Sequence, residues 1–124
     1  MRIGELAQRA GTSTRALRYY EEHGLVRPRR AANGYRSYDE AELRIVAEIR
    51  ALLGAGFDLD DIRPFVACLR AGNPSGDICP DSVSTLRRKL AEVDSYIDRL
   101  ETVRGQLRGQ LTAACEFDRI EEGR

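Results

Sequence analysis

The chain has 124 residues, of which 20 are lysine or arginine and 20 are aspartate or glutamate, so its formal net charge at pH 7 is +0. This length leaves room for one small domain with an extension and excludes the large enzyme folds. No stretch approaches the roughly 20 apolar residues of a membrane-spanning helix, and charges near Met1 interrupt the apolar run of a signal peptide, so we expect a cytoplasmic protein without a membrane partner.

The positive charge is concentrated at the start of the chain. Residues 1–38 hold eight arginines and three acids, a net charge of +5, which leaves −5 for the remainder. Apart from chance clustering, such asymmetry is typical of a nucleic-acid-binding or membrane-binding end joined to a different module. The total of +0 therefore does not argue against a nucleic-acid partner.

Two short amphipathic helices are predicted within residues 3–24. The first ends at Gly11, which suits a left-handed cap, and Ser13 can cap the second. Apolar side chains of the second helix turn inward, and the outward positions are Thr14, Arg15, Arg18 and Tyr19. Two helices joined by a glycine-containing turn form a helix-turn-helix unit, whose second helix enters the DNA major groove.

Residues 25–38 carry the signal of a β-hairpin. Asn33 and Gly34 favour a tight turn. The residues after the turn alternate as in a strand, with Tyr35 and Ser37 on one face and Arg36 and Tyr38 on the other. Pro28 lacks an N–H and so confines its strand to an edge, which predicts a small two-stranded wing. The arginines of such a wing would meet DNA phosphates beside a recognition helix. The alternative is a loop whose arginines are simply solvated.

Two further helices are predicted from Asp39 to Leu53 and from Asp58 to Leu69. Each begins with a capping aspartate and acids in the first turn. Pro64 lacks the N–H that a helix interior uses, so we expect a kink or a late start of the second of these helices. Both are acidic to neutral, which favours a scaffold role.

A long amphipathic helix is predicted after a flexible linker at residues 71–80. Residues 80–115 contain no internal proline, so a continuous helix would measure about 54 Å. Its apolar residues recur in steps of three and four, interrupted by Arg104: Val83, Leu86, Leu90, Val93, Ile97, Leu100, Leu107, Leu111 and Ala114. Packing on the N-terminal module could cover only part of this seam, so we expect a second copy in a two-fold dimer.

Three motifs resemble the MerR family of bacterial transcription regulators: IGELA at residues 3–7, TRALRYYEEHGL at 14–25 and GYRSY at 34–38. The resemblance extends over essentially the whole chain. It implies a mainly α fold, a winged helix-turn-helix DNA-binding domain followed by a long helix that forms an antiparallel coiled-coil dimer. The implied boundaries are 1–70 for the DNA-binding domain with connector helices, 71–80 for the linker, 81–115 for the dimerisation coiled coil and 116–124 for a C-terminal tail.

The resemblance also implies a function. A homodimer would bind double-stranded promoter DNA at a two-fold operator and distort it, which would affect RNA polymerase indirectly. Thr14 and Arg15 would face base edges. The implied phosphate contacts are Arg18, Tyr19, Arg36 and Tyr38.

The three cysteines are the candidate effector or metal residues. If Pro80 takes the first helical position, Cys79 lies at the N-cap, where the helix dipole favours a thiolate. Cys115 lies at the other end, so an antiparallel partner would bring it near Cys79, a layout similar to that of the metal-responsive family members. The chain departs from them because no second cysteine and no histidine follows Cys115.

A second arrangement pairs Cys68 with Cys79 across the linker. Such a pair could form a redox-sensitive disulfide or share a soft ion. The structural alternative is that Cys68 packs in the core and Cys115 merely ends the helix. The sequence does not establish a cofactor. A metal ion bound by the thiols is one option.

Two other function classes compete with a thiol-sensing regulator. An enzyme is not expected, because the sequence holds no catalytic triad, phosphate-binding glycine loop or adequate cluster of metal ligands. A coiled-coil adaptor without DNA binding would leave the basic N-terminal unit unexplained. Within the family, an organic effector or none remains an alternative to a metal or an oxidant.

Overall fold

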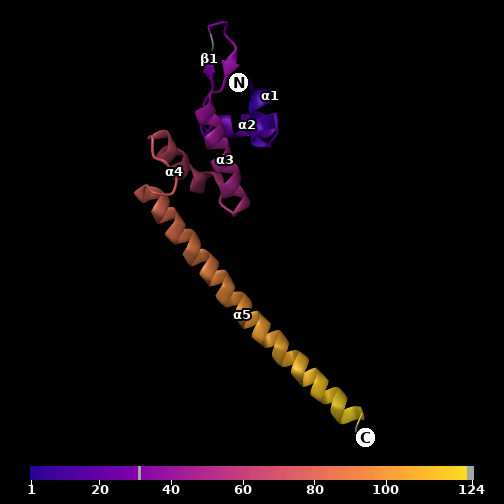
Figure 1. Cartoon of the computed structure of the whole chain (residues 1–124). Helices are drawn as coiled ribbons and strands as arrows, with labels where there is room; N and C mark the ends of the chain where they lie inside the picture. The colour runs from indigo at the N-terminus through magenta and orange to yellow at the C-terminus, as the bar shows by residue number, and fades with distance from the viewer. Residues whose placement is uncertain (31, 123–124) are drawn as a thin grey trace. The chain divides into compact units, whose positions relative to one another are not determined.

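The computed structural model describes residues 1–30 and 32–122 and is mainly helical, as predicted (Figure 1). In chain order the described elements are α1 (Ile3–Ala10), α2 (Thr14–Glu22), β1 (Arg29–Arg30), β2 (Arg36–Ser37), α3 (Glu40–Gly54), α4 (Leu59–Arg70) and α5 (Pro80–Glu122). The chain divides into two units, residues 1–85 and the residues from Leu86 onward. The first unit therefore includes the beginning of α5.

The predicted helix-turn-helix is present at the start of the chain. Gly11 adopts φ of +68° and donates its N–H to carbonyl groups in the last turn of α1, which ends that helix. The Ser13 hydroxyl accepts a hydrogen bond of 3.1 Å from the backbone N–H of Ala16, which caps α2. Local signals therefore determine both ends of the turn.

The core of the first unit brings together side chains from all four of its complete helices. Its members include Leu6 of α1, Leu17 of α2, Ile49 of α3 and Ile62 of α4, each of them fully buried. Burying a side chain of this size contributes about 1.5–3 kcal/mol. This core fixes α2 against the scaffold helices α3 and α4.

The predicted wing is an antiparallel hairpin in which Arg29 pairs with Ser37 and Arg30 with Arg36. Gly34 has φ of +83° in its turn, a conformation that favours glycine. The two strands are short, and each leaves side chains of arginine exposed.

Helices α3 and α4 begin where the capping aspartates predicted them. The Asp58 and Asp61 side chains form a capping box, which starts α4 before Pro64. Pro64 is accommodated inside the helix, so the alternative of a late start is wrong.

The segment between α4 and α5 is packed, which corrects the expectation of a flexible linker. Gly76 is so close to α4 that a Cβ atom on it would lie 2.9 Å from the Phe65 carbonyl oxygen. The buried Ser82 hydroxyl donates a hydrogen bond of 2.6 Å to the Gly76 carbonyl. These tertiary contacts hold a segment whose glycine, proline and serine content alone indicates flexibility.

Helix α5 has 43 residues, equivalent to about 65 Å. It continues beyond Cys115 to Glu122, so the part of the predicted tail that the structure describes is helical. No proline or glycine interrupts residues 110–122, and charged helix-forming residues extend the helix there. Gly123 and Arg124, also assigned to the tail, lie outside the described residues.

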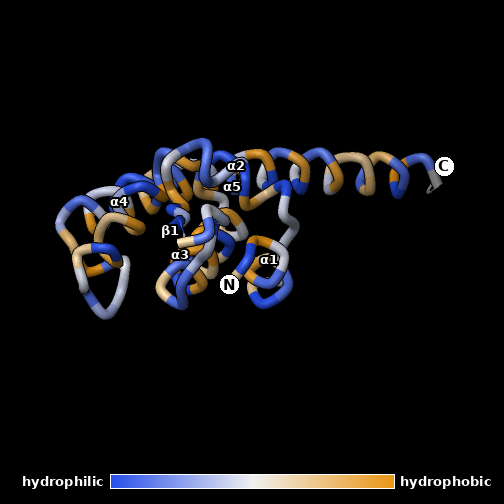
Figure 2. Tube along the Cα trace, turned by 90° about the horizontal axis from the view of Figure 1, so that it is seen from above, coloured by the Kyte–Doolittle hydropathy of each residue, from blue (hydrophilic) through white to orange (hydrophobic). Residues whose placement is uncertain are grey.

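Apolar positions recur along α5 between hydrophilic ones (Figure 2). The predicted seam is exposed along most of its length, from 38% at Leu86 to 66% at Leu100 and Leu111. None of the helices in the described part of the chain has the length and apolar character needed to cross a membrane.

Candidate nucleic-acid interface

Helix α2 exposes four of the six side chains predicted to contact DNA. Leu17 and Tyr20 are buried, and the helical period turns the opposite face outward. One hollow of the surface is lined by Thr14, Arg15, Arg18, Tyr19 and Glu22. The structure therefore gathers the predicted base-reading residues and two of the predicted phosphate contacts on one face.

Tyr19 and His23 contact each other on this face. Their ring centroids are 4.4 Å apart, with the edge of one ring against the face of the other. Tyr19 remains 50% exposed. The contact limits the motion of the Tyr19 side chain while leaving it accessible.

Glu21 joins α2 to the wing. Its carboxylate accepts a hydrogen bond of 2.6 Å from Arg36 Nη1 and one of 2.8 Å from the Tyr38 hydroxyl. The Arg36 side chain nevertheless remains 58% exposed. One carboxylate thus fixes the wing beside α2 and leaves Arg36 accessible.

Tyr38, predicted to contact phosphate, lines a hollow together with Arg18 and Arg36, but most of its side chain is buried. It is only 2% exposed, and its ring belongs to the core. Burial, together with the Glu21 carboxylate, raises the pKa of the Tyr38 phenol to about 12, so the hydroxyl stays protonated and donates to Glu21 at neutral pH. Through Glu21, which also binds Arg36, Tyr38 helps to orient the wing.

A second hollow, of about 210 Å³, is lined by Tyr35 of the wing and by Arg2, which was not among the predicted DNA contacts. The Arg2 guanidinium lies 4.9 Å from the centroid of the Tyr35 ring. Arg18 and Arg36 line the same hollow, so three guanidinium groups from α2, β2 and the residue before α1 surround one space. The sequence signal for Arg2 was its position as a basic residue directly before the first helix.

Backbone hydrogen bonds hold the start of the chain against the wing. The Met1 amino group donates to the Tyr38 carbonyl oxygen at 2.8 Å, and the Tyr38 N–H donates to the Met1 carbonyl oxygen at 2.7 Å. Arg2 is therefore kept next to β2.

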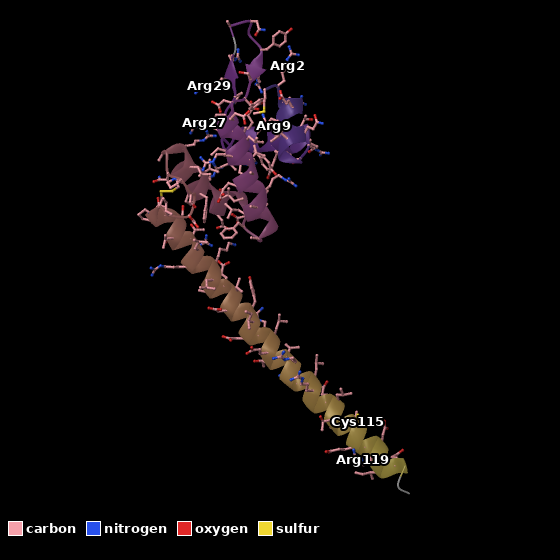
Figure 3. All side chains as sticks on the ribbon, viewed as in Figure 1. Arg2, Arg9, Arg27, Arg29, Cys115 and Arg119 are labelled. Carbon is pink, nitrogen blue, oxygen red and sulfur yellow. A yellow bond between two sulfur atoms is a disulfide. The ribbon has the colours of Figure 1, made fainter. Side chains whose placement is uncertain are left out.

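The cysteines lie in two places. Cys68 of α4 and Cys79, which precedes α5, form a disulfide with their Cα atoms 5.9 Å apart, visible as the yellow bond in Figure 3. Asn73 Nδ2 donates to the Cys68 carbonyl oxygen at 3.0 Å and lies 3.3 Å from Cys79 Sγ. Cys115 is a free, exposed thiol in the second unit.

A metal ion would need several donor side chains close together. Among the residues that the structure describes, no group of three or more His, Cys, Asp or Glu side chains could hold a metal ion. The disulfide also leaves no thiolate on Cys68 or Cys79. With the disulfide formed, the described His, Cys, Asp and Glu side chains of one chain do not fit a metal ion.

Comparison with known families matches both halves of the chain. The model described as "MerR HTH family regulatory protein" matches residues 1–67, and the one described as "MerR, DNA binding" matches residues 43–110. The HTH-type transcriptional regulator HmrR of Rhizobium leguminosarum bv. viciae is 33% identical over 115 residues, covering 93% of this chain and 86% of the relative. The regulator CueR of Escherichia coli O157:H7 is 34% identical over 122 residues, covering 95% and 85%.

Two solved structures have a similar fold. PbrR691 from Ralstonia metallidurans CH34, crystallised with lead(II), superposes with a TM-score of 0.70 at 28% identity, covering 86% of this chain and 81% of its own. HiNmlR, a MerR family regulator bound to promoter DNA, gives a TM-score of 0.55 at 24% identity, covering 79% and 78%. The second likeness shows the fold alone.

Proposed function

The chain belongs to the MerR family of DNA-binding transcription regulators, and from this premise we propose that it binds a two-fold promoter operator as a homodimer and distorts the DNA. Distortion costs a few kcal/mol, which phosphate contacts on both sides of the bend offset. RNA polymerase would respond indirectly, through the altered promoter, in the bacterial cytoplasm. The relatives are transcription regulators, which supports a role other than catalysis.

The observation that carries the proposal is the exposed basic face of α2 beside a wing that Glu21 holds in place. Thr14 and Arg15, in the first turn of α2, would contact base edges, since this end of a recognition helix enters the major groove. Contacts to the phosphate backbone are assigned to Arg18, Tyr19, Arg36 and, in addition, Arg2. Tyr38 would act by positioning Glu21 and the wing.

Dimerisation would use the seam of α5. A stripe with Leu100 at 66% exposure is unfavourable in water, and a second copy of the same helix is the simplest cover for its whole length. An antiparallel pair would place two copies of α2 on two half-sites related by two-fold symmetry.

Replacing Arg18 with alanine is expected to weaken binding to specific and random DNA alike, because a phosphate contact carries no sequence information. The slope of log K against log salt should fall by about 0.9 for each phosphate contact that is lost. Fluorescence anisotropy with labelled duplexes at several salt concentrations measures both. Arg99→Ala, an equal change of charge on α5, is the control, and an unchanged slope in Arg18→Ala would contradict the assignment.

We further propose that thiol chemistry at Cys68 and Cys79 sets the regulatory state, with an oxidant as the effector. Oxidation of the two thiols forms the S–S bond and releases two protons and two electrons, which hydrogen peroxide accepts as it becomes two water molecules. The disulfide joins the end of α4 to the start of α5, so its formation would constrain the link between the DNA-binding helices and the dimerisation helix.

Serine variants of the cysteines test this mechanism. Operator binding by Cys68→Ser and Cys79→Ser should no longer respond to peroxide, whereas Cys115→Ser, the matched control, should respond like the wild type. Binding is measured with reductant, with peroxide and with added metal ions. A metal response that requires both Cys79 and Cys115 would replace the oxidant with a metal ion, and wild-type behaviour of all three variants would refute thiol sensing.

A further inference from the structure

A cavity of about 360 Å³ opens in the first unit, between the root of the wing, the beginning of α3 and the last turn of α4. Its charged lining consists of Arg27, Arg29, Arg44, Arg70, Asp39 and Glu42. None of these residues lines the two hollows of the DNA-binding face. In the view of Figure 3, the labelled Arg27 and Arg29 lie on one side of the wing and Arg2 lies on the other.

The charge of this cavity is not balanced. Four guanidinium groups face two carboxylates, and both carboxylates already have arginine partners: Asp39 pairs with Arg29 at 3.4 Å and Glu42 with Arg70 at 2.7 Å. Among the described residues, the partner of Arg44 is a neutral acceptor, the Pro74 carbonyl oxygen, at 3.1 Å. The Arg27 side chain is exposed at the rim. Two positive charges therefore remain in surplus around one space.

Arg70 adds a buried donor without an acceptor. Its Nη1 and Nη2 atoms bind the Glu42 carboxylate at 2.7 and 3.1 Å, and Nη2 also donates to the Leu25 carbonyl oxygen at 2.7 Å. These bonds hold the guanidinium plane in one orientation. Its Nε atom is buried and has no hydrogen-bond partner among the residues that the structure describes. Because Nε is closed to solvent, Arg70 lines the open cavity through other atoms of its side chain.

We propose that the cavity binds a small organic anion. A carboxylate or phosphate would accept hydrogen bonds from the exposed guanidinium groups of Arg27 and Arg44, and the fixed guanidinium group of Arg70 would add positive charge beside them. Its apolar part would lie against the apolar lining, Pro28, Ile45 and Leu69. The volume is at the lower end of the range for small-molecule sites, which limits the ligand to the size of a simple metabolite.

Occupancy of this site would link two parts of the first unit. Arg27 precedes the strand β1 by two residues, and Arg70 ends α4, two residues after the disulfide-bonded Cys68. An anion that binds Arg27 and Arg44 would therefore connect the root of the wing to α3, beside the end of α4. Binding of the anion in this cavity requires neither the operator nor thiol sensing.

The experiment follows the Nε–Hε resonance of Arg70 in the full-length chain labelled with ¹⁵N-arginine, and Arg70→Lys identifies that resonance. Benzoate and inorganic phosphate are titrated separately at constant ionic strength, with chloride as the reference anion. We expect a saturable shift with benzoate or phosphate and none with chloride. Arg27→Gln and Arg44→Gln should each weaken the binding about tenfold, as expected for the loss of one charge-assisted hydrogen bond, and Arg99→Gln should leave it unchanged.

Three results would overturn the proposal. The first is the absence of a saturable shift with both probes, and the second is an equal shift with chloride. The third is a shift caused only by a DNA duplex, which would assign the cavity to the phosphate backbone of DNA. Because Arg27→Gln and Arg44→Gln leave the Arg70–Glu42 pair intact, unfolding would not obscure the comparison, and a circular dichroism spectrum verifies the fold.

Discussion

Replacing Glu42 with alanine is expected to lower the free energy of unfolding by about 3–5 kcal/mol. The Glu42 carboxylate is buried, accepts two hydrogen bonds from Arg70 and accepts a third from the Arg27 backbone N–H at 3.1 Å. Its removal leaves a largely buried guanidinium without a counter-charge and a backbone donor without an acceptor. Urea denaturation followed by circular dichroism measures the loss.

Glu40→Ala is the matched control for this prediction. Glu40 also belongs to the first turn of α3 and also pairs with an arginine, Arg9, at 2.7 Å, but its side chain is 71% exposed. Water screens that pair, so the midpoint of unfolding should change little. Equal losses in the two variants would mean that burial of the Glu42–Arg70 pair is not what stabilises the junction of α3, α4 and the wing.

Replacing Leu100 with aspartate in the middle of the α5 seam is expected to convert the proposed dimer into a monomer. Each copy would then place a buried carboxylate in an apolar interface, and the two-fold axis doubles the effect. A monomer contacts one half-site instead of two, so the affinity for a two-fold operator should fall on the order of 100-fold. Sedimentation velocity and anisotropy measure the two effects on the same sample.

Ser95→Asp adds the same charge to the same helix at an exposed position away from the seam, and it should remain dimeric with normal affinity. A dimeric Leu100→Asp protein would show that the seam is not the interface. A monomeric variant with wild-type operator affinity would show that DNA binding does not need the dimer.

The secondary structure near the DNA-binding face could be predicted from the sequence because its signals are local. Gly11 and Ser13 determine the turn between α1 and α2, and Asn33 with Gly34 marks the wing. The burial of Tyr38 was not predictable in this way. The alternating pattern separates two faces of a strand, but which face is covered depends on Met1 and Glu21, which are distant in sequence.

Two further differences between prediction and structure also arise from contacts between residues distant in sequence, and a third arises from local helix propensity. The pairing of Glu42 with Arg70 spans 28 residues, and no periodic pattern records it. The linker composition indicated flexibility, but Gly76 is buried by contact with α4. The helix beyond Cys115 was missed although Phe117 and Ile120 follow Ala114 in steps of three and helix propensity continues to Glu122.

Selection of DNA sequences by the purified protein tests the central claim most directly. The wild-type chain is incubated with a library of random duplexes, and the bound fraction is sequenced over several rounds, in parallel with a Thr14→Ala/Arg15→Ala double variant. We predict that the wild type enriches an inverted repeat, because two copies of α2 read two half-sites, and that the double variant loses this sequence preference while retaining salt-sensitive binding. Failure of the wild type to enrich any sequence, or enrichment of the same repeat by the double variant, would contradict the account.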